Sequence, residues 1–236
     1  MLRNHITKRT FTSFWSQIFR DEKIKIKQAI TGKHGNLPWM RSREVDLLQE
    51  LLLALKPKKC LEWGSGNSSI YFTKLFTHDF SWISIEHNKE WFETIKNQIK
   101  NPKLTIHYVG ADTDYEYEEN NDGSYKDFES YINFPNQKGP FDFIFIDGRA
   151  RVECVKKAIT LLSDNGVICL HDANRLEYKE YVSTIPSTFI FNDWRKKSGG
   201  FWLMSKSPEL IQKCIDTQHY SDIFSIYTIV GRRIKV

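Results

Sequence analysis

Short apolar runs separated by helical patterns fill the middle of the chain. The apolar runs occupy residues 59–63, 81–86, 104–109, 142–147 and 166–171, and the helical patterns occupy 68–78, 88–100 and 149–163. Strands that alternate with helices predict right-handed crossovers and a parallel sheet covered by helices on both faces. The predicted fold class is therefore α/β and doubly wound.

The C-terminal part of the chain has a different pattern. Strand-like runs at 187–192 and 200–205 are joined through a turn-forming Ser-Gly-Gly at 198–200, and a further apolar run occupies 223–230. Strands joined by a turn of this kind pair antiparallel. We therefore predict a mostly parallel seven-stranded sheet with an antiparallel C-terminal edge.

A basic amphipathic segment precedes the strands. Residues 1–20 contain no acid. The apolar side chains of this segment have the spacing of one helix face: Phe11, Phe14, Trp15, Ile18 and Phe19. A helix packed on the main domain, a helix on a membrane surface and a cleaved organellar presequence all fit this pattern. We divide the chain into an N-terminal helical extension, 1–40, and a ligand-binding domain, 41–236, in which 113–140 form a lid-like insertion.

Composition narrows the class of protein. The 236 residues fit one core, and a mean hydropathy of -0.49 without an apolar stretch near twenty residues predicts no transmembrane span. The cysteines are widely spaced, which predicts reduced core thiols in a cytoplasmic protein, peripheral to a membrane if residues 1–20 bind one. They are Cys60, Cys154, Cys169 and Cys214.

The net charge of +5 is divided unevenly. Residues 1–60 are basic, whereas 111–142 are acidic. A nucleic-acid-binding protein usually collects its basic residues around a recognisable reading element, and the sequence has none. We therefore expect a small-molecule partner and no specific nucleic acid.

The turn after the first strand carries the first candidate chemistry. Gly64 and Gly66 let a ligand approach the main chain closely. Glu62 lies before them, and Glu86 ends the next strand twenty residues after Gly66, where an acid can accept hydrogen bonds from ribose hydroxyls. Ser69 stands near the place of the third glycine of nicotinamide-binding turns, and a carboxylate in the turn would repel phosphate. These residues favour a ligand with ribose and ammonium groups.

This ordered set resembles that of class I S-adenosylmethionine-dependent methyltransferases, over about residues 40–206. The resemblance rests on Glu62-x-Gly64-x-Gly66, Glu86, an aspartate after the fourth strand and the antiparallel tail. It implies that S-adenosylmethionine is the cofactor. The methionine moiety would lie at Glu62 and the glycine turn, the ribose at Glu86, and the adenine beside His87 and Asp112. The implied cofactor-binding residues are Glu62, Gly64, Ser65, Gly66, Ser68, Glu86, His87 and Asp112.

Titratable residues follow the fourth and fifth strands, whose carboxyl ends should border the acceptor site. His171 has the ordinary pKa of a general base near neutral pH, and Asp147 could act as the base or orient the acceptor. We expect these two residues to be catalytic. The arginines of the same segments could bind an anionic acceptor, and Arg149 and Arg151 could instead pair with Glu153. The three arginines are Arg149, Arg151 and Arg175.

A metal ion offers a second mechanism for the same place. Asp147, Asp172 and Asn174 supply oxygen atoms of the kind that hold Mg²⁺ or another divalent cation and lower the pKa of a coordinated hydroxyl. O-methyltransferases of the catechol and sugar-modifying kinds, which this sequence resembles loosely, use such a trio. Ala173 departs from their pattern, because asparagine usually follows the second acid at once.

The predicted activity is O-methylation of a hydroxyl on a saccharide or another small molecule. Aromatic residues in predicted loops could stack on a sugar ring or pack in the core: Trp39, Tyr125, Tyr131 and Trp194. The alternatives are an aminopropyl-type transferase of the same fold and a non-catalytic module that binds adenosine or a nucleotide sugar. A basic helix on a membrane would instead suggest a lipid-linked glycan as the acceptor.

Overall fold

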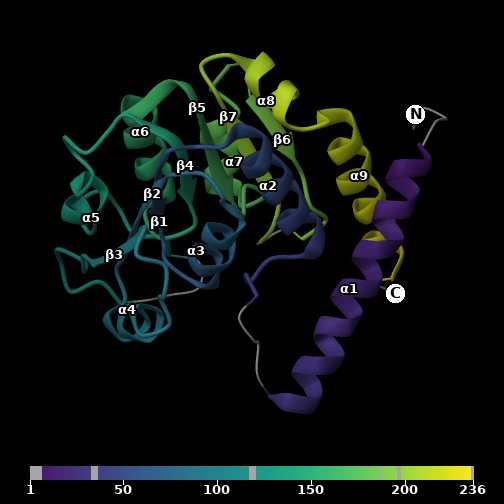
Figure 1. Ribbon diagram of the computed structural model, residues 1–236, viewed down its shortest axis with the longest axis horizontal. Helices are drawn as coiled ribbons and strands as arrows, with labels where there is room; N and C mark the ends of the chain where they lie inside the picture. The colour runs from purple at the N-terminus through teal and green to yellow at the C-terminus, as the bar shows by residue number, and fades with distance from the viewer. Residues whose placement is uncertain (1–6, 33–36, 117–120, 187, 196–197, 235–236) are drawn as a thin grey trace.

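The computed structural model describes residues 7–32, 37–116, 121–186, 188–195 and 198–234, with side chains up to residue 230. These residues form a seven-stranded sheet with the order β3-β2-β1-β4-β5-β7-β6 (Figure 1). The strands are β1 (Lys59–Trp63), β2 (Ser81–Glu86), β3 (Leu104–Tyr108), β4 (Phe141–Ile146), β5 (Leu162–His171), β6 (Thr188–Phe191) and β7 (Phe201–Met204). The first five are parallel, and β7 runs antiparallel to both β5 and β6. The predicted sheet and its antiparallel edge are confirmed.

The strand order reverses direction at β1, which lies between β2 and β4. Trp63 at the end of β1 is in register with Ile85 of β2 and Ile146 of β4. The Asp147 nitrogen donates to the Trp63 carbonyl at 2.8 Å, and the Gly64 nitrogen donates to the Ile85 carbonyl at 2.8 Å. Because ligands of open parallel sheets bind where the strand order reverses, this edge is the expected binding crevice.

Helices cover both faces of the sheet. One face carries α1 (Lys8–Thr31), α2 (Ser42–Leu55), α3 (Asn67–Phe72), a 3₁₀ turn (Thr73–Leu75), α4 (Lys89–Lys96), α8 (Pro208–Cys214) and α9 (Thr217–Ile234). The other face carries α5 (Glu129–Asn133), α6 (Arg151–Leu161) and α7 (Leu176–Val182). Alternate residues of each strand reach the two cores, as in β4, where Phe143 and Phe145 enter one core and Ile144 enters the other.

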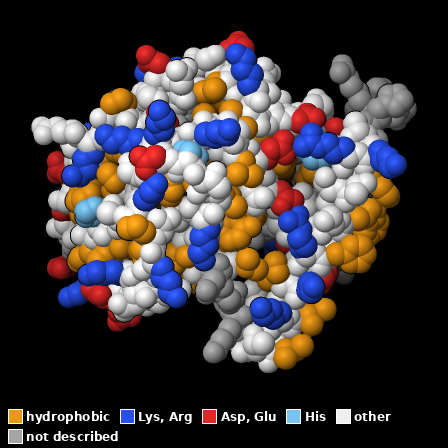
Figure 2. All heavy atoms as spheres, in the orientation of Figure 1, with side chains coloured by type: hydrophobic (Ala, Val, Ile, Leu, Met, Phe, Trp, Pro, Cys, Tyr) orange, Lys and Arg blue, Asp and Glu red, His pale blue; other side chains and the backbone are white. Residues whose placement is uncertain are grey.

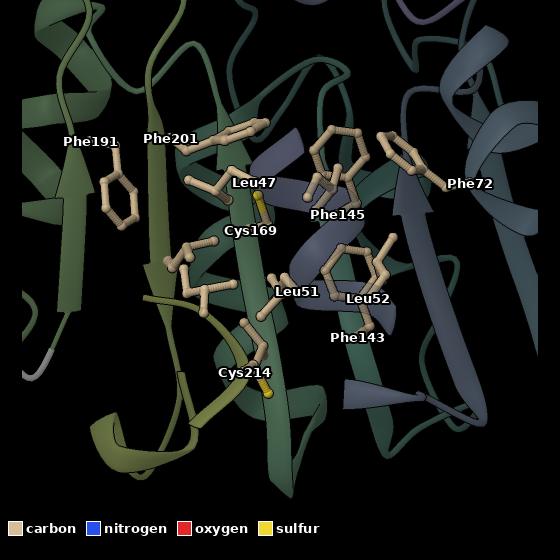
Figure 3. Close-up of a cluster of buried hydrophobic side chains, with 14 of the residues drawn as sticks. Leu47, Leu51, Leu52, Phe72, Phe143, Phe145, Cys169, Phe191, Phe201 and Cys214 are labelled. Carbon is tan, nitrogen blue, oxygen red and sulfur yellow. The ribbon is translucent and has the colours of Figure 1, made fainter. Parts of the chain in front are cut away.

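The α2 helix is the central covering helix of the first face. Leu47, Leu48, Leu51 and Leu52 are fully buried, and their spacing gives one continuous apolar face. Figure 3 shows Leu47, Leu51 and Leu52 of α2 beside the phenylalanines of β4. Burial of such a side chain stabilises the fold by about 1.5–3 kcal/mol. This packing fixes the start of α2 near the carboxyl edge of the sheet.

The N-terminal extension forms one long helix, α1, that packs against α2 and α9. The Thr7 hydroxyl caps its start by accepting from the Thr10 nitrogen at 3.1 Å, and the helix ends at Gly32, whose φ is 63°. Phe14 lies in the core beneath it. The helix continues beyond the predicted amphipathic segment at 1–20, of which residues 1–6 lie outside the described part. Among the described residues, no helix is long and apolar enough to cross a membrane.

Two apolar segments of the sequence have structures that the pattern did not specify. Phe128, Tyr131 and Ile132 in the predicted lid-like insertion 113–140 are buried in the second core, so this part of the insertion belongs to the body of the domain. The apolar run 223–230 lies within α9. The four cysteines are buried and free, as predicted.

Candidate active site

The turn between β1 and α3 lies against the turn that follows β4. Gly64 has a φ of 92°, a left-handed conformation that favours glycine. A Cβ atom there would lie 2.5 Å from the Gly148 nitrogen and 2.6 Å from the Asp147 carbonyl oxygen. A Cβ atom at Gly66 would meet nothing closer than the Ser68 Oγ at 3.7 Å. Gly64 is therefore needed for contact between the two turns, and Gly66 leaves the start of α3 open to a ligand.

The Glu86 carboxylate at the end of β2 fixes this turn. One oxygen accepts from the Ser65 nitrogen at 3.0 Å and the Ser65 hydroxyl at 3.2 Å. The other accepts from the nitrogens of His87 at 3.0 Å and Asn88 at 2.8 Å. A carboxylate accepts about four hydrogen bonds, so a ribose hydroxyl would reach Glu86 by replacing the Ser65 hydroxyl. The ribose role of Glu86 stays a prediction.

The Glu62 carboxylate lies inside the protein rather than in an open crevice. Its side chain is fully buried, and its two oxygens accept from the Ser68 hydroxyl at 2.9 Å and the Trp82 indole at 2.9 Å. Burial raises the pKa of Glu62 to about 7. The carboxylate thus has protein partners, and its interaction with a ligand ammonium group stays a prediction.

The two residues predicted to border the adenine both contact the start of α5. The His87 ring meets Phe128 and Tyr131 edge-on, with centroids 5.7 and 6.1 Å away. The exposed Asp112 carboxylate accepts from the Ser130 nitrogen at 2.8 Å. An adenine bound beside His87 and Asp112 would therefore also lie beside α5.

Ionisable side chains gather at the carboxyl ends of β4 and β5 in a group that we call the ionic cluster. It consists of Glu44, Asp147, Arg151, His171, Asp172, Arg175 and Arg195. Asp147 and His171, the predicted catalytic pair, are in direct contact, with the His171 Nδ1 3.0 Å from the Asp147 Oδ1. The structure therefore brings these two residues together.

Three carboxylates surround the buried His171 ring. Besides Asp147, the Glu44 Oε2 lies 3.7 Å from its Nε2, and the Asp172 Oδ1 lies 3.9 Å from its Nδ1. Burial works to lower the pKa of His171, but the charges of Asp147 and Asp172 and the contact with Glu44 raise this pKa well above its ordinary value. The three carboxylates therefore favour the protonated form of His171, and the argument for a general base from its ordinary pKa loses its basis.

The Arg151 guanidinium lies between two of the same carboxylates. Its Nη1 is 3.2 Å from the Asp147 Oδ1 and 3.3 Å from the Asp172 Oδ2, and donates to the His171 carbonyl at 2.9 Å. Its Nε donates to the Gly148 carbonyl at 3.0 Å. Burial opposes the charge, yet Asp147 and Asp172 raise the pKa of Arg151 above its ordinary value. This predicted acceptor-binding residue is instead a buried link between β4 and β5.

The other two predicted acceptor-binding arginines lie nearer to solvent. Arg149 is 3.9 Å from Asp122, an acid of the insertion, and Arg175 is 3.4 Å from Asp172. Glu153, the alternative partner that the sequence offered, pairs with a lysine of its own helix. Arg175 therefore belongs to the ionic cluster, whereas Arg149 faces the insertion through Asp122.

Glu44 and Arg195 belong to the cluster although the sequence did not single them out. Glu44 accepts from the Arg195 guanidinium at 2.8 Å and the Gly200 nitrogen at 3.1 Å, and its second oxygen accepts from the Arg41 nitrogen at 2.8 Å. Burial opposes ionisation, but His171 and Arg195 hold the pKa of Glu44 below its ordinary value. A glutamate in the first turn of a predicted helix is typical of helix capping. This pattern predicts the contact of Glu44 with the Arg41 nitrogen, but it does not predict the contacts with Arg195, Gly200 and His171.

Comparisons with solved structures address the architecture. The fold is similar to that of a Staphylococcus aureus protein assigned as a caffeoyl-CoA O-methyltransferase. The two sequences are 17% identical, and the match covers 77% of this chain and 90% of that chain, with a TM-score of 0.53. An O-methyltransferase from Bacillus cereus in complex with S-adenosylhomocysteine gives 17% identity, 77% and 88% coverage, and a TM-score of 0.53. The O-methyltransferase TomG from Streptomyces achromogenes, in complex with S-adenosylmethionine, is 16% identical. The match covers 86% of this chain and 91% of TomG, with a TM-score of 0.50.

The fold is that of class I S-adenosylmethionine-dependent methyltransferases. No protein-family model matches the chain, and no curated protein matches it. In this methyltransferase fold, the β1 turn, Glu86 and the ends of β4 and β5 share one edge of the sheet.

Two of the three predicted metal ligands, Asp147 and Asp172, contact an arginine in this methyltransferase fold. Ligand atoms of Asp147, His171 and Asp172 lie within 4.8 Å of one another, a spacing that could hold an ion. The Arg151 Nη1, however, contacts both carboxylates and already supplies their counter-charge. A divalent cation would meet strong repulsion from this guanidinium group. The side chains as arranged do not fit a metal ion.

The third predicted metal ligand, Asn174, is bound elsewhere. Its amide oxygen accepts from the Asp193 nitrogen at 3.0 Å, and its amide nitrogen donates to the Asp193 and Arg195 carbonyls, the latter at 2.6 Å. Asn174 therefore fixes the connection between β6 and β7. It does not join Asp147 and Asp172 as a ligand.

The predicted aromatic residues divide into core and surface positions. Trp39 is 67% exposed and lies on Trp91, with ring centroids 5.2 Å apart, and the Trp91 indole donates to the Ser65 carbonyl at 2.8 Å. Tyr131 is fully buried, and Trp194 packs against the first core. Tyr125 is exposed on the insertion. Trp39 and Trp91 thus place an aromatic surface beside the β1 turn.

Proposed function

We propose that this protein is an S-adenosylmethionine-dependent methyltransferase that transfers a methyl group to a hydroxyl of a saccharide or another small molecule without a divalent metal ion. The contact between the turns at Gly64 and Asp147 carries this proposal. It joins the turn expected to hold the methionine end of the cofactor to a carboxylate of the ionic cluster whose side chain is 24% exposed. Donor and acceptor would therefore meet at Asp147.

The surroundings of the β1 turn support a cofactor without phosphate. Glu62 and Glu86 are both buried beside the turn, and hydroxyl, indole and main-chain N–H groups satisfy them. In their ionised forms these two carboxylates would repel a phosphate and attract an ammonium or sulfonium group. The open position at Gly66 leaves room for such a ligand. These residues fit S-adenosylmethionine.

Asp147 is the residue best placed to act on the acceptor hydroxyl. When bound, S-adenosylmethionine supplies a methyl group on a positively charged sulfur for in-line transfer. Among the described residues, the side-chain contacts of Asp147 all go to Oδ1, which is held by His171 and Arg151. Its Oδ2 would accept the hydrogen bond of the acceptor hydroxyl, orient it, and take its proton as the new C–O bond forms. The protonated His171 would position Asp147.

The acceptor in this proposal is uncharged. The three arginines that could have bound an anionic acceptor all lie beside carboxylates: Arg151 beside Asp147 and Asp172, Arg149 beside Asp122, and Arg175 beside Asp172. The exposed Trp39 ring on Trp91 offers an apolar face to a sugar or aromatic ring. Both observations favour a neutral hydroxylated ring compound.

Cofactor binding is the first test of this function. Calorimetric titration of the protein with S-adenosylhomocysteine should give a dissociation constant of about 1 μM or tighter. A folded sample that shows no binding would refute the methyltransferase proposal. Binding without turnover on any hydroxyl acceptor would favour the non-catalytic adenosine-binding alternative.

Substitution of Asp147 tests the mechanism. Asp147→Asn should reduce kcat by about 10²–10⁴-fold, because the amide cannot take the proton, while the affinity for S-adenosylhomocysteine is kept. Asp164→Asn is the matched control, since Asp164 lies on the surface with a 92% exposed side chain. Full turnover in Asp147→Asn would reject Asp147 as the base. A loss of wild-type turnover in a chelator, restored by Mg²⁺, would reject the metal-free mechanism.

A further inference from the structure

The outward face of α1 carries large apolar side chains that the domain does not cover. We call them the outer stripe; they are Phe11, Trp15, Phe19, Ile26 and Ile30. Their exposed fractions run from 44% for Trp15 to 78% for Ile30. The buried side chains of the same helix, which face the domain, are Thr10, Phe14 and Gln17. Packing within the chain therefore explains the inner side of the helix, which includes two polar residues, but does not explain the apolar outer stripe.

The outer stripe follows the edge of the molecule. The apolar residues are spaced by four or seven positions, so they form one row along α1. Figure 2 shows hydrophobic side chains along the edge where α1 lies in Figure 1, with Lys and Arg side chains beside them. A row of this length is unusual on a surface that faces water alone.

Positive charge accompanies the outer stripe. Residues 8–31 contain six Lys or Arg residues and two Asp or Glu residues. Lys8, Lys23 and Lys27 are exposed and lie one helical turn from Phe11, Phe19 and Ile30, respectively. Glu22, an acid of the outward side, pairs with Lys25. The apolar row is thus bordered by lysines whose long side chains can extend away from it.

The same lysines border an apolar groove on the flank of α1. Lys23 and Lys27 line a groove of about 310 Å³ together with apolar side chains that include Ile24, Met40 and Val45. Apolar surface with lysines at its margin therefore continues from the outer stripe toward α2. This combination matches the two layers of a lipid surface, acyl chains and anionic headgroups.

We propose that α1 binds the surface of an anionic lipid bilayer, with the outer stripe inserted at the boundary between headgroups and acyl chains. The lysines would lie at the level of the lipid phosphates. A second copy of this chain is a poorer occupant, because two helices with an excess of positive charge would repel each other. An anionic bilayer offers acyl chains to the outer stripe and phosphate groups to the lysines that border it.

Vesicle binding by the full chain tests the proposal. The protein is sedimented with vesicles of phosphatidylcholine alone and with vesicles that contain about 30% phosphatidylglycerol. We expect partitioning at least about tenfold stronger on the anionic vesicles, reduced by salt. A blue shift of tryptophan emission should accompany binding and should shrink in Trp15→Phe, which keeps an apolar ring in the outer stripe.

Two variants separate the apolar and the charged contributions. Phe11→Gln/Phe19→Gln/Ile26→Gln should lose binding to anionic vesicles by at least about tenfold, and Lys8→Gln/Lys23→Gln/Lys27→Gln should lose the preference for anionic lipid. Leu53→Gln/Leu176→Gln is the matched control, because both leucines are exposed outside α1. Circular dichroism checks that each variant is folded.

Three results would overturn the proposal. They are equal binding by the outer-stripe variant and the wild type, equal partitioning onto neutral and anionic vesicles, and a wild-type dimer that the outer-stripe substitutions convert to a monomer without any vesicle binding. The last result would assign the outer stripe to a second copy of the chain.

Discussion

The two parts of the candidate site hold their buried carboxylates by different means. Beside the β1 turn, Glu62 is satisfied by a hydroxyl and an indole, and its pKa is raised by burial to about 7. In the ionic cluster, burial also opposes ionisation of Asp172, but His171 and Arg151 lower its pKa to about 2. The carboxylates beside the β1 turn can therefore still attract a positively charged ligand. The carboxylates of the ionic cluster already have positively charged partners.

The charges within the ionic cluster show why this difference matters for the chemistry. Three carboxylates face three guanidinium groups and a protonated imidazole. Arg195 also pairs with the buried Asp193. The carboxylates of the cluster thus already have counter-charges, and a metal ion would add a charge that nothing there requires. In our proposal the positively charged cofactor binds at the β1 turn, and an uncharged acceptor binds at the ionic cluster.

Removal of Arg151 should produce the largest effect on stability. Arg151→Met leaves Asp147 and Asp172 without the guanidinium between them, so the free energy of unfolding should fall by about 3–5 kcal/mol. Urea unfolding of the wild type and the variant measures this loss. Arg175→Met is the matched control, because its side chain is 20% exposed and lies 3.4 Å from Asp172 at the margin of the cluster, and its loss should be about 1 kcal/mol or less. Equal losses would show that Arg151 has no special place in the cluster.

The sheet could be predicted from the sequence because its signals are local. The apolar runs at 59–63 and 81–86 coincide with β1 and β2, since buried parallel strands appear as short continuous apolar segments. The start of α5 could not be predicted in this way. Its five residues are too few to show a helical period, and the acidic residues around Phe128 and Tyr131 suggested an exposed segment.

The candidate site was predictable only where its residues follow strand ends. Asp147 and His171 follow β4 and β5, so the topology alone brings them together. Glu44 and Arg195 come to the same place from segments far away in the sequence. The pattern of apolar and polar residues does not predict a contact between such distant segments. The protonation of His171 depends on these long-range neighbours. Its ordinary pKa was therefore a poor basis for predicting a general base.

The pH dependence of stability should reveal Glu62. The folded-state pKa, about 7, exceeds the unfolded value of about 4.3, so the folded state binds more protons between these values. The contribution of Glu62 to stability is therefore fully present below about pH 4 and falls by about 4 kcal/mol as the pH rises through about 7. Unfolding free energies of the wild type and Glu62→Gln at about pH 5 and about pH 8 test this. The same pH dependence in both proteins would contradict the assignment.

The smallest expected effect distinguishes the two roles of Glu86, which could bind the cofactor ribose or only fix the β1 turn. Glu86→Gln keeps the size of the side chain but removes the charge, so the affinity for S-adenosylhomocysteine should fall about tenfold, or about 1.4 kcal/mol. Glu90→Gln, an exposed position on α4, is the calorimetric control and should leave the affinity unchanged. If Glu86→Gln lowers the unfolding free energy but leaves the affinity unchanged, Glu86 only holds Ser65 in place. The β1 turn would then attract its positively charged ligand through Glu62 alone, and the cofactor affinity should follow the ionisation of that one carboxylate.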